Sequence, residues 1–198
     1  MIDILLVRHA HTYGNAQRQI GYSGATDRLD EKGYSQIPQL GKKLSHRIRS
    51  LLNSRKRRVY LHRSDTNRTR QTLEYSLKNL EGIDCKIVTP HLDLGEIDMG
   101  DMIGKIIDRD IYQRVFTSTH QRFPNGESRK DVAERMKRYL SSLDDDAIHV
   151  VFSHGVAISC TVHEILGDYT KRIKIMNASM SHIRLDRSRI PEILAIDE

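Results

Sequence analysis

The sequence predicts an α/β fold, a three-layer sandwich in which a mainly parallel sheet carries helices on both faces. Short apolar runs of strand length alternate along the chain with longer segments whose apolar residues recur every three or four positions. Strands separated by helices pair in parallel, and parallel sheets are covered on both sides. No repeat, low-complexity tract or linker divides the 198 residues, so we expect residues 1–198 to form a single domain.

The first expected elements are a strand and a long helix. Residues 2–7 (IDILLV) lead into the polar, glycine-containing stretch 9–15, which predicts a buried strand followed by a loop. Asp30 is suited to cap the helix that follows it. Pro38 removes a backbone donor inside that helix, so we expect a kink or a delayed start there. The apolar face of the helix consists of Ile37, Leu40, Leu44, Ile48 and Leu51.

The remaining elements continue the alternation. Further strands are expected over residues 59–61, 86–88, 148–152 and 180–185. Further helices are expected after Ser64 and Asp65 through Leu80, over 132–143 and over 156–166. Functional residues lie outside the carboxyl ends of parallel strands. We therefore expect the loops after Val7 and Phe152 to lie at the same edge of the sheet.

The composition is that of a globular protein with an excess of positive charge. The net charge is +6, from 32 Lys+Arg against 26 Asp+Glu, with 38% hydrophobic residues. We interpret the densest cationic run as a solvated helix end whose cations oppose the helix dipole. The excess of positive charge fits either nucleic acid or a small anionic substrate. The sequence has only three Phe and no Trp, and the run contains no aromatic residue, which argues against a surface that stacks on bases and favours the small anion. The run consists of Arg47, Arg49, Arg55, Lys56, Arg57 and Arg58.

The sequence also favours a cytoplasmic protein. Two cysteines, Cys85 and Cys160, are too few for a disulfide framework, and both are expected to be reduced and packed. The N-terminal apolar run is too short for a signal peptide, and no segment reaches the roughly 18 apolar residues of a membrane helix. We expect no membrane contact, and the oligomeric state is left open.

Two of the expected buried strands deliver a histidine at their carboxyl ends. His9 follows the run LLV and Arg8, and His154 follows the run VVF and Ser153. Residues placed in this way on two strands of one sheet can converge on a single cleft. The pair predicts a functional site at this edge.

The histidines lie within a series of motifs. Residues 6–15 (LVRHAHTYGN) match the pattern L-x-R-H-G-x-T-x-x-N except that Ala10 replaces a glycine. The further motifs, in order, are Gly21, 27–33 (DRLDEKG), 64–72 (SDTNRTRQT), 94–100 (LGEIDMG), 126–128 (GES) and 153–155 (SHG). The series resembles the histidine phosphatase superfamily, the phosphoglycerate-mutase-like enzymes, from Leu6 to about Asn177.

This resemblance implies a metal-independent phosphatase without a cofactor, acting on a small phosphorylated metabolite through a phosphohistidine. It makes Arg68 a phosphate-binding residue and Glu96 the proton donor. The chemistry of the side chains agrees, because the planar guanidiniums of Arg8 and Arg68 can each bind two phosphate oxygens. His9 can attack phosphorus if a hydrogen bond from one ring nitrogen to a carbonyl leaves the other unprotonated. A protonated His154 would bind the equatorial oxygens.

Several positions have two possible roles. Asn15 and the backbone at Gly21 and Gly155 are candidates for phosphate contacts. Gly155 opens an expected helix, whose free N–H groups favour an anion, but a tight turn without a Cβ would also need a glycine. The methyl group of Ala10 lies beside the nucleophile in sequence and could reduce activity.

Substrate specificity is expected from the loops between Gly95 and Ser128. Their side chains mix apolar and cationic groups, which fits a second anionic group on the ligand, although solvent-facing arginines are common. Residues 101–104 (DMIG) lack the Trp and Glu that the family often has there. The candidate specificity residues are Met99, Met102, Ile103, Arg109, Arg114 and Arg122.

Three alternatives are left open. The family also contains phosphoglycerate mutases, which return the phosphate to the substrate but are generally longer, and Ala10 allows a catalytically weak phospho-ligand-binding relative. His9 and His11 also resemble the H-x-H metal motif of amidohydrolase barrels, although such barrels typically have about 250 residues. His163 has no second histidine at helical spacing and is expected on a helix surface.

Overall fold

The computed structural model of the chain describes residues 1–19, 21, 24–53, 57–104, 113, 117–144, 146–186 and 188–198. Within them, six strands form one sheet in the order β3-β2-β4-β1-β5-β6. The four strands from β3 to β1 in this order are parallel, whereas β5 is antiparallel to β1 and β6 to β5. The predicted mainly parallel sheet is confirmed. The strands are β1 (Ile2–Arg8), β2 (Arg58–Arg63), β3 (Cys85–Ile87), β4 (Ala147–Ser153), β5 (Met180–Leu185) and β6 (Pro191–Ala195).

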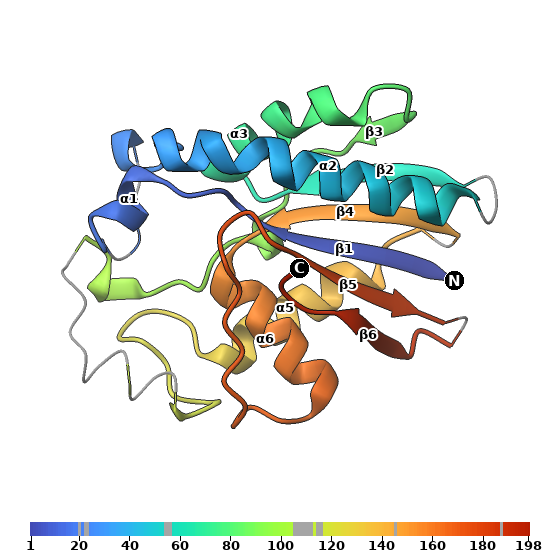
Figure 1. Cartoon of the computed structure of the whole chain (residues 1–198). Helices are drawn as coiled ribbons and strands as arrows, with labels where there is room; N and C mark the ends of the chain where they lie inside the picture. Colours follow the sequence, from blue (N-terminus) through green and yellow to red (C-terminus); the bar gives the residue numbers. More distant parts are fainter. Residues whose placement is uncertain are drawn as a thin grey trace.

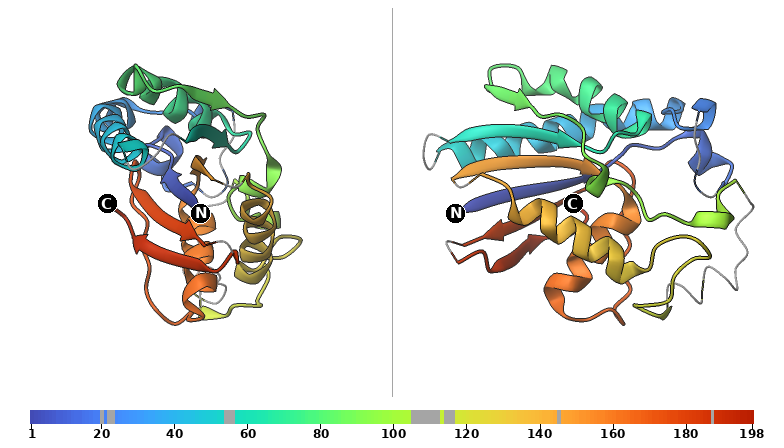
Figure 2. Two further views of the ribbon diagram at one scale, coloured as in Figure 1. Left: turned by 90° about the vertical axis from the view of Figure 1, so that its right-hand side faces the viewer. Right: turned by 180° about the vertical axis from the view of Figure 1, so that it is seen from behind.

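Helices cover both faces of the sheet, as the sequence predicts. Figures 1 and 2 show α2 and α3 on one face and α5 and α6 on the other. The principal helices are α2 (Glu31–Asn53), α3 (Asn67–Ser76), α5 (Arg129–Ser141) and α6 (Gly155–Leu166). The shorter helical segments are α1 (Tyr13–Ala16) and the 3-10 turns Gly24–Thr26, Leu77–Leu80, Leu92–Leu94 and Gly100–Met102.

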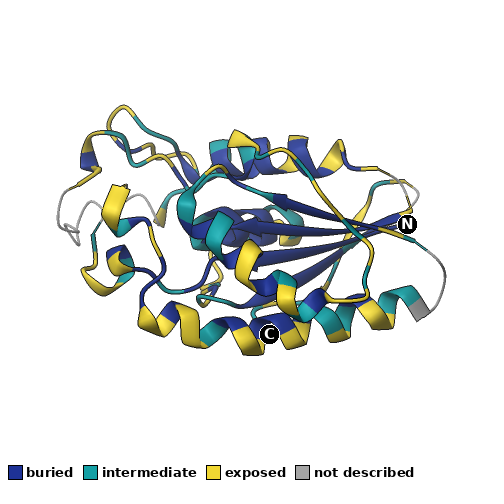
Figure 3. Ribbon diagram, turned by 90° about the horizontal axis from the view of Figure 1, so that it is seen from above, coloured by how far each residue is buried: buried dark blue, intermediate teal, exposed yellow. Residues whose placement is uncertain are grey.

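Two apolar cores separate the three layers. Along β1, Ile4 and Leu6 belong to the core beneath α5 and α6, whereas Leu5 and Val7 belong to the core beneath α2 and α3. Successive side chains of a strand point to opposite faces, so a strand buried on both faces is apolar at nearly every position. Figure 3 shows the result, with buried strands at the centre and exposed residues along the outer sides of the helices.

The long helix α2 starts where its cap predicts and passes through Pro38 without interruption. The Oδ1 atom of Asp30 accepts a hydrogen bond from the Gly33 N–H at 2.8 Å, which confirms Asp30 as the N-cap. The expected delayed start at Pro38 is wrong. Pro38 lies on the exposed side of the helix, where water can bind the carbonyl that loses its partner. The packing of the buried face therefore keeps the helix continuous past Pro38.

The basic run differs from a solvated helix end at Arg57. This guanidinium is buried, donates to the Asp3 carboxylate and binds the Ala147 carbonyl at 2.5 Å. Burial opposes the charge of Asp3, but hydrogen bonds from His182 and Arg57 outweigh it and lower the pKa of Asp3 far below its usual value. Arg57 therefore joins the starts of β1 and β4. The residues of the run outside the described part are Arg55 and Lys56.

The carboxyl ends of β1 and β4 lie side by side. Val7 is paired with Phe152, and Arg8 with Ser153, in a parallel register. One residue beyond β1, the His9 N–H donates to the Ser153 carbonyl at 3.1 Å. The expectation that the two loops share one edge is confirmed.

Two remaining expectations concern membrane contact and the cysteines. In the part of the chain that the structure describes, no helix has the length and apolarity needed to cross a membrane. Cys85 is half-buried, Cys160 is buried, and both are free thiols. Burial raises the pKa of Cys160 to about 12, so this thiol stays protonated.

Candidate active site

His9 is held in one tautomer at the end of β1. Its Nδ1 atom lies 2.8 Å from the Ala10 carbonyl oxygen. A carbonyl only accepts hydrogen bonds, so Nδ1 carries the proton and Nε2 carries the lone pair. Burial and the cations Arg68 and Arg8 hold the pKa of His9 well below its usual value. At neutral pH, His9 is therefore an uncharged imidazole with an unprotonated Nε2.

His154 packs beside His9, with the two ring centroids 5.3 Å apart. Its Nδ1 atom accepts from Arg68 Nε at 3.1 Å, so its Nε2 atom carries the proton and donates to Ser64 Oγ at 2.8 Å. Burial, Arg68 and His9 hold the pKa of His154 well below its usual value. The ring is therefore neutral and both nitrogens bind protein groups, whereas a contact with the equatorial phosphate oxygens was expected only of its protonated form.

Arg68 is fixed by a carboxylate as well as by His154. Its Nη1 atom donates to Asp27 Oδ1, and Asp27 Oδ2 accepts from the Asn67 N–H at 2.8 Å. Since Asn67 is the first residue of α3, Asp27 fixes the helix start and the guanidinium together. The sequence analysis gave Asp27 no role of its own, although it lies in one of the motifs. Its position in the motif at residues 27–33 was the signal that could have pointed to a role in the site.

Arg8 lies against the start of α6. Its Nη1 atom donates to the Ile175 carbonyl at 2.5 Å. A Cβ on residue 155 would lie 3.1 Å from both Cζ and Nε of Arg8, closer than ordinary van der Waals contact. The missing side chain of Gly155 therefore leaves room for the Arg8 guanidinium, and the phosphate contact of its backbone stays a prediction.

Glu96 occupies the N-terminus of α6. Its carboxylate accepts from the backbone N–H groups of Ile97 at 3.0 Å, Val156 at 3.2 Å and Ala157 at 3.1 Å. Two N–H groups at this helix end, those of Val156 and Ala157, are thus already bound by a carboxyl group of the chain itself. Because α6 begins directly after His154, Glu96 lies at the same helix start as His154.

Asn15 is connected to the backbone of His9 by a residue that the sequence analysis missed. The Asn177 side-chain amide donates to Asn15 Oδ1 and to the His9 carbonyl, each at 3.1 Å. No local pattern could reveal this contact, because Asn177 is 162 residues from Asn15.

Gly21 has φ +52°, and a Cβ there would lie 2.8 Å from Ile103 Cγ1. Conformation and space account for this glycine, and its phosphate contact stays a prediction.

Ala10 places no strain on the loop that carries His9. The positive-φ residues do not include Ala10, and its N–H donates to Thr72 Oγ1 at 3.0 Å. Its methyl group is buried in a small apolar cluster with Leu29 and Ile37. The backbone here therefore does not require a glycine.

The structure contradicts the amidohydrolase alternative. The sheet is an open one, with β3 and β6 at its edges, and not a closed barrel. His11 Nδ1 lies 2.7 Å from Asp30 Oδ2, whereas His9 Nδ1 binds its own loop. Over the described ranges, no three His, Cys, Asp or Glu side chains are grouped so that they could hold a metal ion.

Two further expectations are tested away from the site centre. His163 is buried and not on a helix surface, because Arg129 Nη2 donates to its Nδ1 at 2.9 Å and its Nε2 donates to the Lys171 carbonyl at 2.8 Å. Among the specificity candidates, Met102 is buried, and Arg122 is paired with a carboxylate on α5. The candidates outside the described residues are Arg109 and Arg114.

The fold and the site together define a class of α/β protein in which two histidines and two arginines meet at the carboxyl edge of a parallel sheet. Comparison with protein families identifies the class more closely. The chain belongs to the histidine phosphatase superfamily (branch 1), whose family model matches residues 4–197.

Individual relatives carry names from both activities of the family. "Probable phosphoglycerate mutase GpmB" of Erwinia tasmaniensis is 29% identical over 204 residues, and its counterpart in Salmonella paratyphi C is 32% identical over 203, each match covering 96% of this chain and 87% of the relative. Solved structures share the fold, among them the following two. "Mycobacterial hydrolase 1" has a TM-score of 0.79 at 20% identity, covering 99% of this chain and 98% of that one. Mycobacterial glucosyl-3-phosphoglycerate phosphatase in complex with VO3 has a TM-score of 0.78 at 19% identity, covering 98% of each chain.

Proposed function

We propose that the protein is a metal-independent phosphatase that hydrolyses a small phosphomonoester through a phosphohistidine at His9. The observation that carries this proposal is the hydrogen bond from His9 Nδ1 to the Ala10 carbonyl, which makes Nε2 the unprotonated nitrogen. Attack on a phosphate dianion requires an uncharged nucleophile in a fixed orientation beside positive charge. Arg8 and Arg68 supply that charge.

The reaction proceeds in two steps. His9 Nε2 bonds to phosphorus while the bond to the ester oxygen breaks, and Glu96 in its acid form gives the leaving oxygen a proton. Water then attacks the phosphohistidine, the N–P bond breaks, and the Glu96 carboxylate takes the proton of the water. Ester and water become alcohol and inorganic phosphate, and His9 and Glu96 return to their starting forms.

The remaining residues bind and orient the phosphate. Arg8 and Arg68 stabilise the negative charge on the equatorial oxygens of the transition state. His154, neutral in the free site, orients Arg68 through its Nδ1 atom. Asn15 and the backbone at Gly21 complete the proposed contacts. These groups bind the phosphate and not the rest of the substrate, so we assign the choice of substrate to the loops after Glu96. We also propose that the protein is cytoplasmic.

The role of Glu96 has a test based on the leaving group. An alkyl phosphate needs a proton on its departing oxygen, whereas p-nitrophenolate departs as a stable anion. A general acid contributes about two to four decades of rate, so Glu96→Gln should lower kcat/KM by that factor on an alkyl phosphate. The same variant should change kcat/KM on p-nitrophenyl phosphate far less. Equal turnover of the alkyl phosphate by the variant and the wild type would remove Glu96 from the mechanism.

The nucleophile has its own test. The purified protein should release phosphate from p-nitrophenyl phosphate in the presence of a metal chelator, and vanadate should inhibit it. Denaturing the protein during turnover should trap labelled phosphate on His9. His9→Ala should abolish both turnover and labelling, whereas the control His11→Gln should retain both. Turnover that survives His9→Ala contradicts the proposal, and phosphate binding without any turnover by the wild type would indicate a phospho-ligand-binding relative.

Phosphoglycerate mutase activity is the second candidate, because the relatives from Erwinia tasmaniensis and Salmonella paratyphi C carry that name. In that reaction the phosphohistidine returns its phosphate to the bound substrate instead of to water. Incubation with 3-phosphoglycerate separates the two reactions. A phosphatase releases free phosphate, and a mutase produces the 2-phosphate isomer with little release.

A further inference from the structure

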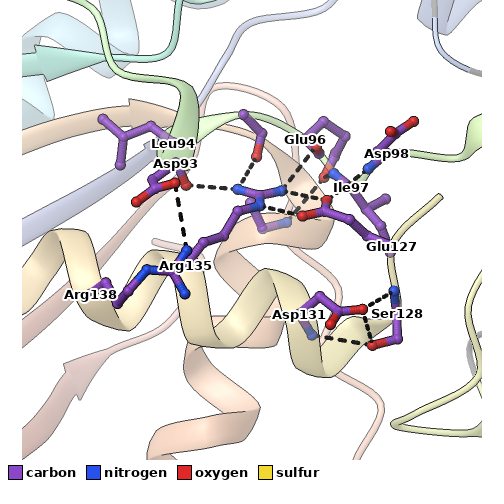
Figure 4. A network of polar contacts seen from close by, with 12 residues as sticks. Asp93, Leu94, Glu96, Ile97, Asp98, Glu127, Ser128, Asp131, Arg135 and Arg138 are labelled. Carbon is purple, nitrogen blue, oxygen red and sulfur yellow. Dashed lines mark hydrogen bonds and ion pairs between the residues drawn. The ribbon is translucent and has the colours of Figure 1, made fainter.

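The turn that carries Glu96, residues 93–98, is bound by one buried guanidinium from α5. Arg135 extends from α5 towards this turn, and Figure 4 shows it between residues 93–98 and Glu127. Its Nη1 atom donates to the carbonyls of Asp93 at 2.7 Å and Gly95 at 2.9 Å. Its Nη2 atom donates to the carbonyl of Glu96 itself at 3.0 Å. Three backbone carbonyls of the turn are therefore fixed by a single side chain.

Glu127 holds both Arg135 and the far end of the same turn. Its carboxylate accepts from Arg135 Nε at 2.8 Å and from Arg135 Nη2 at 3.0 Å. The carboxylate also accepts from the Asp98 N–H at 2.9 Å, and the Glu127 N–H donates to the Asp98 carbonyl at 2.8 Å. The turn is thus bound before and after Glu96.

All five N–H groups of Arg135 are engaged in this arrangement. The five bonds to the three carbonyls and the two oxygens of Glu127 match the five donors of a guanidinium. A lysine at this position would keep the charge but offer three donors from one nitrogen, so it could not reproduce the planar set. Arg135 is buried, which makes each of these bonds costly to lose.

We propose that Arg135, together with Glu127, is a positioning residue for Glu96. It fixes the turn so that the Glu96 carboxyl group stays at the N-terminus of α6, next to His154, where the leaving oxygen departs. All the N–H groups of Arg135 are used within the chain, so we assign it no contact with substrate, and the inference rests on the proposed function of Glu96. A displacement of about 1 Å in a reacting group can cost 10²-fold in rate, so this control over the turn has a measurable effect.

The test compares Arg135→Lys with Arg138→Lys on two substrates. Arg138 lies one turn further along α5, is exposed and only approaches the Asp93 carboxylate at 3.9 Å, so its variant is a matched control. For Arg135→Lys we expect kcat/KM on an alkyl phosphate to fall about 10- to 100-fold, but kcat/KM on p-nitrophenyl phosphate to fall less than about threefold. The inhibition constant of inorganic phosphate should not change, and the control should behave as the wild type.

The outcomes separate this inference from the proposed function. A loss that is equal on both substrates indicates general damage to the fold and overturns the positioning role, and so does the absence of any loss. If Glu96→Gln shows the leaving-group effect and Arg135→Lys does not, only the positioning role fails. If Glu96→Gln lacks the effect, the proposed acid fails first. Should Arg135→Lys not fold, Glu127→Gln provides the same comparison and is expected to give the same pattern.

Discussion

A chain of buried histidines between β2 and β4 leads to a prediction about stability in acid. The Asp144 carbonyl accepts from His149 Nε2 at 3.1 Å, His149 Nδ1 accepts from His62 Nε2 at 2.8 Å, and His62 Nδ1 accepts from the Tyr139 hydroxyl at 2.9 Å. Both histidine rings in this series of hydrogen bonds are neutral, and each offers one donor and one acceptor. Protonation of either ring would place a second donor where the chain needs an acceptor.

The magnitude follows from the pKa of His62. Burial and the neighbouring His149 lower this pKa to about 3. The unfolded chain, with a pKa near 6.5, therefore binds more protons as the pH falls, and protonation favours unfolding. Between pH 7 and pH 5, with about 1.36 kcal/mol per pH unit, His62 alone should lower the free energy of unfolding by about 2 kcal/mol.

Urea unfolding at both pH values measures this effect in the wild type and in His62→Gln. Glutamine can donate to His149 and accept from Tyr139 but does not titrate. The variant therefore keeps the hydrogen bonds and removes the proton uptake at position 62. The wild type should lose about 2 kcal/mol more than the variant on going from pH 7 to pH 5. Equal losses in the two proteins would refute the assignment of a neutral, buried His62.

Three other predictions use single substitutions or the pH profile. A Cβ on Gly33 would lie 2.0 Å from the His11 carbonyl oxygen, whereas one on Gly41 would lie 2.4 to 2.7 Å from atoms of the Asn79 side chain. A side chain can shift more readily than a backbone carbonyl, so Gly33→Ala should destabilise by about 3 kcal/mol in thermal unfolding and Gly41→Ala by less. Equal effects would contradict the close approach. Asp27→Asn removes the ion pair of Arg68 and should raise the inhibition constant of inorganic phosphate about tenfold, and an unchanged constant would argue against a positioning role. Because the pKa of His9 is lowered, its neutral form persists below pH 6.5, and the acid limb of kcat/KM should follow only the substrate phosphate, which titrates at about pH 6. A limb set by an enzyme group at pH 6.5 would contradict this.

The parallel part of the fold could be predicted because its strands are buried on both faces. Residues 2–7 and 148–152 are apolar at nearly every position, whereas a surface helix or a half-exposed strand would interrupt such a run with polar residues. The strand β6 was not predicted, because it is a half-exposed edge strand that begins at Pro191. The antiparallel direction of β5 could not be inferred either, since a strand's direction leaves no trace in its residue pattern.

The histidine pair of the candidate site could be predicted from sequence, but most of the groups that hold the site together could not. His9 and His154 each follow a buried strand directly, which is a local signal. Asn177 has no such signal, because its partners lie at the other end of the chain. Arg135, by contrast, did have a signal in the sequence. It lies on the same helix face as the buried Val132 and Tyr139, and an arginine on a buried face requires partners.

The spacing of the two histidines comes from the sheet itself. Their rings, 5.3 Å apart, extend from adjacent strands, and paired strands are separated by about 4.8 Å in any sheet. Arg135 anchors the chain on either side of the segment between Gly100 and Pro124. Both ends of that segment therefore stay bound to Arg135 and Glu127, and we expect substitutions at its exposed positions to leave the turn at Glu96 in place.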